Sequence, residues 1–189
     1  MIPIILHLEK SNYTAPVKKI DCFDILEGFH HEIRDALVPF SQAISTLQHS
    51  RKWQPLIYTV IQNFKSFHEA EVAAHTRDEE IAFYPIIGVR WRESKTFDTI
   101  HAPTEYMLRE HTDIASHIHA IGLLSEMLQQ QPANKLALEA LLGEAQAVLM
   151  ILPLHMQKEE QFLFPQARKL LPKEDVETAT TLIQQLHSK

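Results

Sequence analysis

The sequence predicts an all-α protein, folded as an antiparallel up-down-up-down four-helix bundle with an N-terminal arm and a short C-terminal fifth helix. Only 4 of the 189 residues are glycine. The longest apolar patterns repeat every three to four residues, as helices that bury one face require, and few segments alternate as strands do. A chain of this length is expected to form one domain with a full core.

The N-terminal arm is predicted over residues 1–19, where Pro3 and Pro16 disfavour regular structure. The first helix follows, over about residues 20–47, with a kink expected at Pro39. Its apolar residues are spaced alternately by three and four, as one buried seam requires; they are Phe23, Leu26, Ile33, Leu37, Phe40, Ile44 and Leu47.

The second helix is predicted to begin at Pro55, because proline is well placed in the first turn of a helix. It should end at about Ile87, before Gly88, and a linker through Trp91 should lead to the third helix. The third helix is predicted from Pro103 to about residue 130.

The fourth helix is predicted over about residues 133–170, with a bend near Pro153. A fifth, short helix should follow Pro172 and pack on the bundle through one apolar edge, formed by Val176, Ala179, Ile183 and Leu186. The expected division is therefore an arm over 1–19, a bundle over 20–170 and a C-terminal helix over 171–189. Short connections between long helices favour antiparallel neighbours.

Composition disfavours several classes of partner. The formal net charge is −6 and no basic run follows the chain, so a nucleic-acid partner is not expected. The apolar run at residues 2–8 is far too short to span a membrane. Cys22 is the only cysteine, which excludes an internal disulfide and a thiolate metal site, and we expect a cytoplasmic protein.

Histidine is unusually frequent, with 12 residues, and several histidines interrupt the apolar seams. The first and third helices each carry one inward histidine, and the second and fourth each carry an inward histidine with a glutamate four residues later. Residues four apart share one helix face, so an imidazole and a carboxylate can reach one metal ion or two adjacent ions. The candidate metal ligands are His30, His75, Glu79, His111, His155 and Glu159.

An internal repeat supports this arrangement. The sequence HTRDEE at 75–80 recurs as HMQKEE at 155–160, and His30 with Ile33 matches His111 with Ile114. Two helical hairpins, each with one histidine and one His-x-x-x-Glu pair, predict two half-sites that face each other around two metal ions. An ionised glutamate in an apolar seam would cost several kcal/mol without a cation.

This pattern resembles the haemerythrin-like, or HHE cation-binding, family over about residues 20–170. The resemblance implies a non-haem di-iron centre in which the four histidines are terminal ligands and Glu79 and Glu159 bridge the metals. Oxygen-carrying members have a further histidine where this chain has Ala115, and a five-residue His-to-Asp step in the fourth helix. Fewer imidazoles leave more open coordination positions. His68 and Glu71 are similar to residues of di-iron relatives that repair iron–sulfur clusters.

The remaining polar and aromatic residues have simpler interpretations. His68 is either a residue behind the ligands or in a channel, or a partner for Glu71. Tyr84 is interpreted as a packing residue, and so is Tyr106, while Cys22 is interpreted as a small buried side chain. The residues expected to be solvated are His49, His101, His117, His119, His187, Glu80 and Glu160. If the ligand of the fourth helix lay five residues after His155, as in oxygen-carrying members, it would be Glu160.

Imidazole and carboxylate ligands suit iron, manganese or zinc, and not calcium or magnesium. The family resemblance favours two iron ions. The leading hypothesis is a protein that binds or senses O2, NO or iron without catalysing a reaction. The alternatives are a di-iron enzyme in iron–sulfur repair or in peroxide or NO removal, and a metal-free helical interaction module. A ferritin-like oxidase needs two Glu-x-x-His motifs, and the chain has one, Glu27 to His30.

Overall fold

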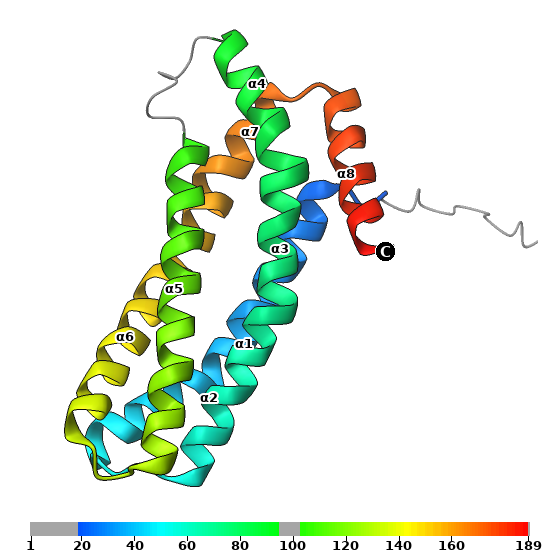
Figure 1. The fold of residues 1–189 in the computed structure, drawn as a ribbon. Coiled ribbons are helices and arrows are strands. Elements are labelled where there is room, and N and C mark those ends of the chain that lie inside the picture. Colours follow the sequence, from blue (N-terminus) through cyan, green and yellow to red (C-terminus); the bar gives the residue numbers. More distant parts are fainter. Residues whose placement is uncertain (1–18, 95–102, 189) are drawn as a thin grey trace, which may run out of the picture.

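The computed structural model describes residues 19–94 and 103–188, and all regular structure in these ranges is helical. The all-α prediction is confirmed. In Figure 1 the long helical segments lie side by side as a bundle, and α8 (Lys173–His187) packs beside the start of α1 (Cys22–Ser50). The predicted arm, apart from Lys19, lies outside the described residues, as do His101 and most of the connection before Pro103.

Helix α1 follows its prediction closely. Asp21 caps its N-terminus in a capping box with Asp24, which satisfies backbone N–H groups of the first turn. Arg51 ends the helix in the left-handed region, at φ 55°. Every apolar residue of the predicted seam is buried, and so is His30. One face of α1 therefore forms a continuous part of the core.

The second helical segment runs without a break from Pro55 to Ser94. It comprises α2 (Pro55–Phe67), a π-helical turn η1 (His68–Val72), α3 (Ala73–Asp78), a second π-helical turn η2 (Glu79–Phe83) and α4 (Tyr84–Ser94). The prediction that Gly88 ends this helix is wrong. Ile87 and Trp91 are buried one turn apart on the same face, and burying two large side chains outweighs the cost of about 1 kcal/mol for a helical glycine.

The third segment is α5 (Pro103–Gln130), which buries Met107, Ile114, Ile118 and Ile121 along one face. The fourth comprises α6 (Lys135–Lys158), capped by Asn134, then a π-helical turn η4 (Glu159–Leu163) and α7 (Phe164–Leu170). Continued with α-helical spacing from His155 and Glu159, the predicted buried face of this segment includes Phe162, and this prediction is wrong. Phe162 is 43 % exposed and Leu163 is 0 % exposed, because the wider π-helical turn delays the buried face by one residue.

Two apolar clusters make up the core in the described residues. One contains Phe40, Ile61, Ile118 and Leu141, and the other contains Phe23, Phe83 and Phe164 together with Ala179 and Ile183 of α8. Along α1, for example, His30 lies between Leu26 of the second cluster and Ile33 of the first. The histidines and glutamates therefore form a polar layer between two apolar ones.

The helical segment Lys135–Leu170 is long and apolar enough to cross a membrane by length and composition, the one such helix in the described ranges. Core helices of water-soluble proteins meet the same criterion. Here the segment contributes buried residues to both apolar clusters, among them Leu141, Leu152 and Leu163. Packing within the bundle therefore accounts for part of its apolar character, since 39 % of its most apolar stretch is buried.

Candidate metal centre

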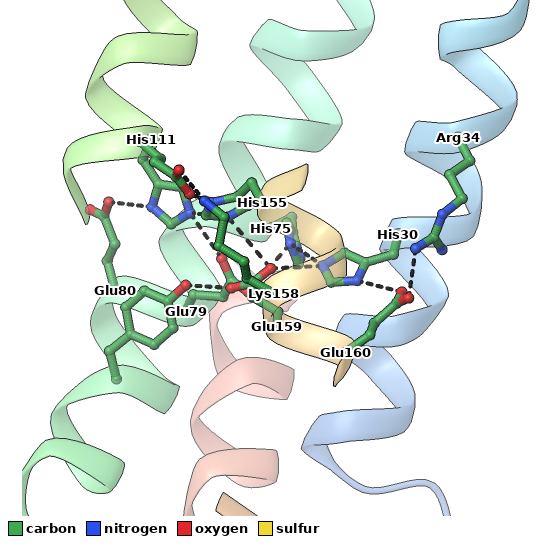
Figure 2. A network of polar contacts seen from close by, with 12 residues as sticks. His30, Arg34, His75, Glu79, Glu80, His111, His155, Lys158, Glu159 and Glu160 are labelled. Carbon is green, nitrogen blue, oxygen red and sulfur yellow. Dashed lines mark hydrogen bonds and ion pairs between the residues drawn. The ribbon is translucent and has the colours of Figure 1, made fainter. Parts of the chain in front are cut away.

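The six residues that interrupt the seams converge at one place inside the bundle (Figure 2). His30 comes from α1, His75 and Glu79 from the second helical segment, His111 from α5, and His155 and Glu159 from the fourth segment; all six are buried. They form two groups of four whose ligand atoms lie within 4.8 Å of one another: His30, His75, Glu79 and Glu159, and Glu79, His111, His155 and Glu159.

The four imidazoles all point Nε2 towards the centre. The Nε2 atoms of His30 and His75 are 3.2 Å apart, and those of His111 and His155 are 3.0 Å apart. Each pair comes from one hairpin of the sequence repeat, His30 with His75 and His111 with His155, so each hairpin supplies one half-site and the two half-sites face each other. This grouping supplies two histidines to each of two neighbouring positions.

The two glutamates belong to both groups. Glu79 places Oε1 3.4 Å from Nε2 of His75 and Oε2 3.2 Å from Nε2 of His111. Glu159 places one oxygen, Oε2, 3.2 Å from Nε2 of His30 and 3.4 Å from Nε2 of His155. Each carboxylate therefore reaches a histidine of both groups.

The donor set fits a cation. Both carboxylates are fully buried, and neither oxygen of Glu79 nor Oε2 of Glu159 accepts a hydrogen bond from the described residues. Burial, and then the negative charge of Glu159, raise the pKa of Glu79 well above its usual value. Buried carboxylates without donors cost several kcal/mol, and positive ions among these oxygens and imidazoles would remove that cost.

Most of the histidines are held by a second carboxylate. Nδ1 of His30 pairs with Glu160 at 2.9 Å, and Nδ1 of His111 pairs with Glu80 at 2.9 Å. Nδ1 of His155 pairs with Glu110 at 3.0 Å. These contacts leave Nε2 of each ring free to bind a metal. Nδ1 of His75, by contrast, has no partner among the described residues.

Glu80 is exposed and Glu160 is partly exposed, as expected, but each also pairs with a histidine of the centre. Arg34 donates to Glu160 at 2.6 Å, and Lys158 donates to Glu110. Burial alone would raise the pKa of Glu160, but its hydrogen bonds with Arg34 and His30 hold that pKa below the usual value. An ionised carboxylate at this position strengthens the hold on the histidine ring.

Tyr84 is a further residue of the site that the sequence interpretation assigned to packing alone. Its hydroxyl donates to Oε1 of Glu159 at 2.5 Å, and its ring stacks on that of His111. Burial, and then the neighbouring carboxylates, raise the pKa of Tyr84 well above its usual value. The hydroxyl therefore keeps its proton near neutral pH and remains a donor.

A pocket of about 220 Å³ lies against the centre. It is lined by His75, His111 and His155, by His68, and by Ala115. The other lining residues are Ile33, Val72, Ala73, Thr76, Arg77, Glu80, Ile81, Ile114, Leu152 and Met156. His68 thus lines the pocket and does not join either ligand group; burial lowers its pKa.

The other histidines of the described residues lie outside the two ligand groups. His117 pairs with Glu144 at 2.5 Å and His49 with the carbonyl of Ser45. His187 is exposed, as expected, and its Nε2 also pairs with buried Asp78 at 2.6 Å. That contact fastens α8 to the segment that carries Glu79.

Comparison with known protein families gives one match. The family described as Hemerythrin HHE cation binding domain matches residues 22–167, a range that includes all six converging residues. The chain belongs to this family. A search among curated proteins found no match. As a haemerythrin-like protein, the chain is a member of a cation-binding family, and its buried histidine and glutamate groups are suited to hold metal.

Proposed function

We propose that this haemerythrin-like protein holds two iron ions and binds or senses a small ligand, O2 or NO, at them. His30, His75, His111 and His155 would be the terminal ligands, and Glu79 and Glu159 would bridge. The observation that carries the proposal is the pair of four-residue groups that share the two buried carboxylates. Such sharing is how two-metal sites place ions about 3.5–4 Å apart.

Iron is preferred on family grounds, because imidazole and carboxylate donors also suit manganese and zinc. When bound, an iron pair supplies open coordination positions and redox chemistry to an incoming ligand. The protein contributes the orientation of the rings through Glu80, Glu110 and Glu160. The pocket is lined by His75, His111 and His155, which supports access of a small molecule to the proposed metal ions.

The proposal includes an up-down-up-down order of the four long helical segments. It is supported by the short connections at residues 51–54 and 131–134, which favour antiparallel neighbours. It also assigns residues 20–170 to the bundle, with an arm before it and a C-terminal helix after it. A cytoplasmic location, without a nucleic-acid or membrane partner, is part of the same proposal.

Metal analysis of protein reduced and loaded with iron under anaerobic conditions tests the proposal. We expect about two iron ions per chain, as in other two-metal sites, and a change in visible absorbance on adding O2 or NO. The variant His75→Ala should lose at least half of the iron. The variant His119→Ala, which changes an exposed histidine of α5, should retain all of it. A colourless iron form that responds to neither gas would contradict the proposal.

A second candidate is a di-iron enzyme that removes peroxide or NO, or repairs iron–sulfur clusters. It is supported by His68, a titratable ring on the wall of the pocket, which is suited to transfer protons during a reaction. Turnover of peroxide or NO, or recovery of a damaged cluster enzyme, that disappears in Glu159→Ala would favour this candidate over binding alone.

The third candidate, a metal-free interaction module, must explain why two fully buried carboxylates lie side by side with three oxygens that accept no hydrogen bond in the described residues. It predicts that removing metal leaves the melting temperature unchanged. Ligands that bind only the folded state raise that temperature. A melting temperature that falls on chelation would exclude the module.

A further inference from the structure

The two halves of the centre carry an aromatic residue at the same place in the repeat. Phe164 follows Tyr84 by 80 residues, the same spacing that separates His155 from His75. The ring of Tyr84 stacks on that of His111, with centroids 6.0 Å apart and planes at 10°. The ring of Phe164 stacks on that of His30, with centroids 5.7 Å apart and planes at 13°. The two aromatic residues therefore differ chiefly in one hydroxyl group.

That hydroxyl makes the two shared carboxylates unequal. It donates to Oε1 of Glu159 at 2.5 Å, so that only Oε2 of Glu159 lies beside Nε2 of His30 and His155. Glu79 accepts no such bond in the described residues, and each of its oxygens lies beside a different histidine. Glu79 thus offers both oxygens to the centre, whereas Glu159 offers one.

We propose that Tyr84 is a positioning residue that holds Oε1 of Glu159 away from the metal pair and thereby keeps a coordination position open for an incoming anion or diatomic molecule. This inference rests on the proposed metal centre. A buried carboxylate oxygen needs a donor or a cation. Without the hydroxyl, the cations are the partners nearest to Oε1, so Glu159 would turn its second oxygen to them and compete with the exogenous ligand.

The variant Tyr84→Phe tests this inference, because it removes the hydroxyl and keeps the ring that stacks on His111. The probe is azide, titrated into the full-length, iron-loaded, oxidised protein and followed by visible absorbance. We expect azide to bind the variant roughly tenfold more weakly, the factor that one hydrogen bond to a charged group contributes. Iron itself should bind the variant as tightly as the wild type or more tightly, as measured by competition with a chelator.

The matched control is Tyr58→Phe. Tyr58 also donates to a glutamate, Glu126 at 2.7 Å, but on the exposed surface of the bundle. This control should bind azide as the wild type does. If Tyr84 served packing alone, Tyr84→Phe would bind azide normally, or would lose iron affinity and melting temperature together, and either result would overturn the inference. A wild type that takes up no iron would refute the proposed metal centre instead.

Discussion

Three further carboxylates contact the proposed histidine ligands, and each accepts a hydrogen bond from Nδ1 of a different histidine. Glu160 serves His30, Glu80 serves His111 and Glu110 serves His155. Such partners fix the orientation of an imidazole and raise its basicity, so that Nε2 binds a cation more tightly. They are therefore expected to contribute to metal affinity although they do not touch the metal.

Replacing Glu160 by glutamine keeps an oxygen near Nδ1 of His30 and removes the negative charge. We expect the variant to bind iron at least about tenfold more weakly, the lower end of the range for such outer partners. The measurement is competition with a chromophoric chelator under anaerobic conditions. The lost charge also frees Arg34, which donates to Glu160 at 2.6 Å.

Glu144→Gln is the control for this prediction, because Glu144 also pairs with a histidine, His117, away from the ligand groups. Its iron affinity should equal that of the wild type. Equal affinities for Glu160→Gln, Glu144→Gln and the wild type would show that the outer carboxylate contributes nothing to metal binding.

At the scale of residues, the sequence predicted the six converging side chains because each interrupts an apolar seam. It did not predict the residues that contact these six side chains from outside, which are Glu80, Glu110, Glu160 and Tyr84. The repeat contained a signal for some of them, since a second glutamate follows the first in both HTRDEE and HMQKEE. Glu110 has no counterpart of that kind, and the hydrogen bond of Tyr84 depends on how the segments pack. Whether the six residues bind metal stays a prediction.

At the scale of elements, π-helical turns set which residues face the core beyond the centre. The glutamate of each His-x-x-x-Glu pair is the first residue of such a turn, Glu79 of η2 and Glu159 of η4. A π-helical turn contains one more residue than an α-helical turn and commonly occurs at functional sites. The seam drawn with α-helical spacing therefore misplaces the buried residue that follows Glu159.

Paired truncations in η4 test this register. Leu163→Ala should lower the free energy of unfolding by about 2–5 kcal/mol, because Leu163 is fully buried. Phe162→Ala should lower it by less than Leu163→Ala does, since Phe162 is 43 % exposed. Urea unfolding of the metal-free variants provides both values. A larger loss of unfolding free energy for Phe162→Ala than for Leu163→Ala would contradict the π-helical register and favour the α-helical one.

The ends of the helices were predictable from the sequence only where local interactions set them. The start of α1 was predictable from Asp21 and the start of α2 from Pro55, because capping and proline act locally. The end of α4 was not predictable, because Gly88 is a local signal for termination and the burial of Ile87 and Trp91 is a tertiary effect. Local rules therefore succeed where no packing competes with them.

At the scale of the whole molecule, a polar layer separates two apolar clusters. A domain stabilised by about 5–15 kcal/mol tolerates such a layer only if its cost is offset. In the metal-free protein, burial and Glu159 raise the pKa of Glu79 above its unfolded-state value. At pH 7 the unfolded glutamate is ionised, so folding must bury its charge or take up a proton, and either requirement lowers stability, because a raised native pKa favours folding only while the group is protonated.

Glu79→Gln is consequently expected to have opposite effects with and without metal. The metal-free variant should be more stable than the metal-free wild type at pH 7, since the neutral amide removes the cost of burying a carboxylate beside Glu159. With iron the order should reverse, because bound metal stabilises the wild type by mass action and the amide is a poorer ligand. Urea unfolding in the presence of chelator and of iron measures both differences. Glu126→Gln, at an exposed glutamate, should change neither. A Glu79→Gln protein that is less stable in both conditions would mean that Glu79 supports the fold itself, and not a cation within it.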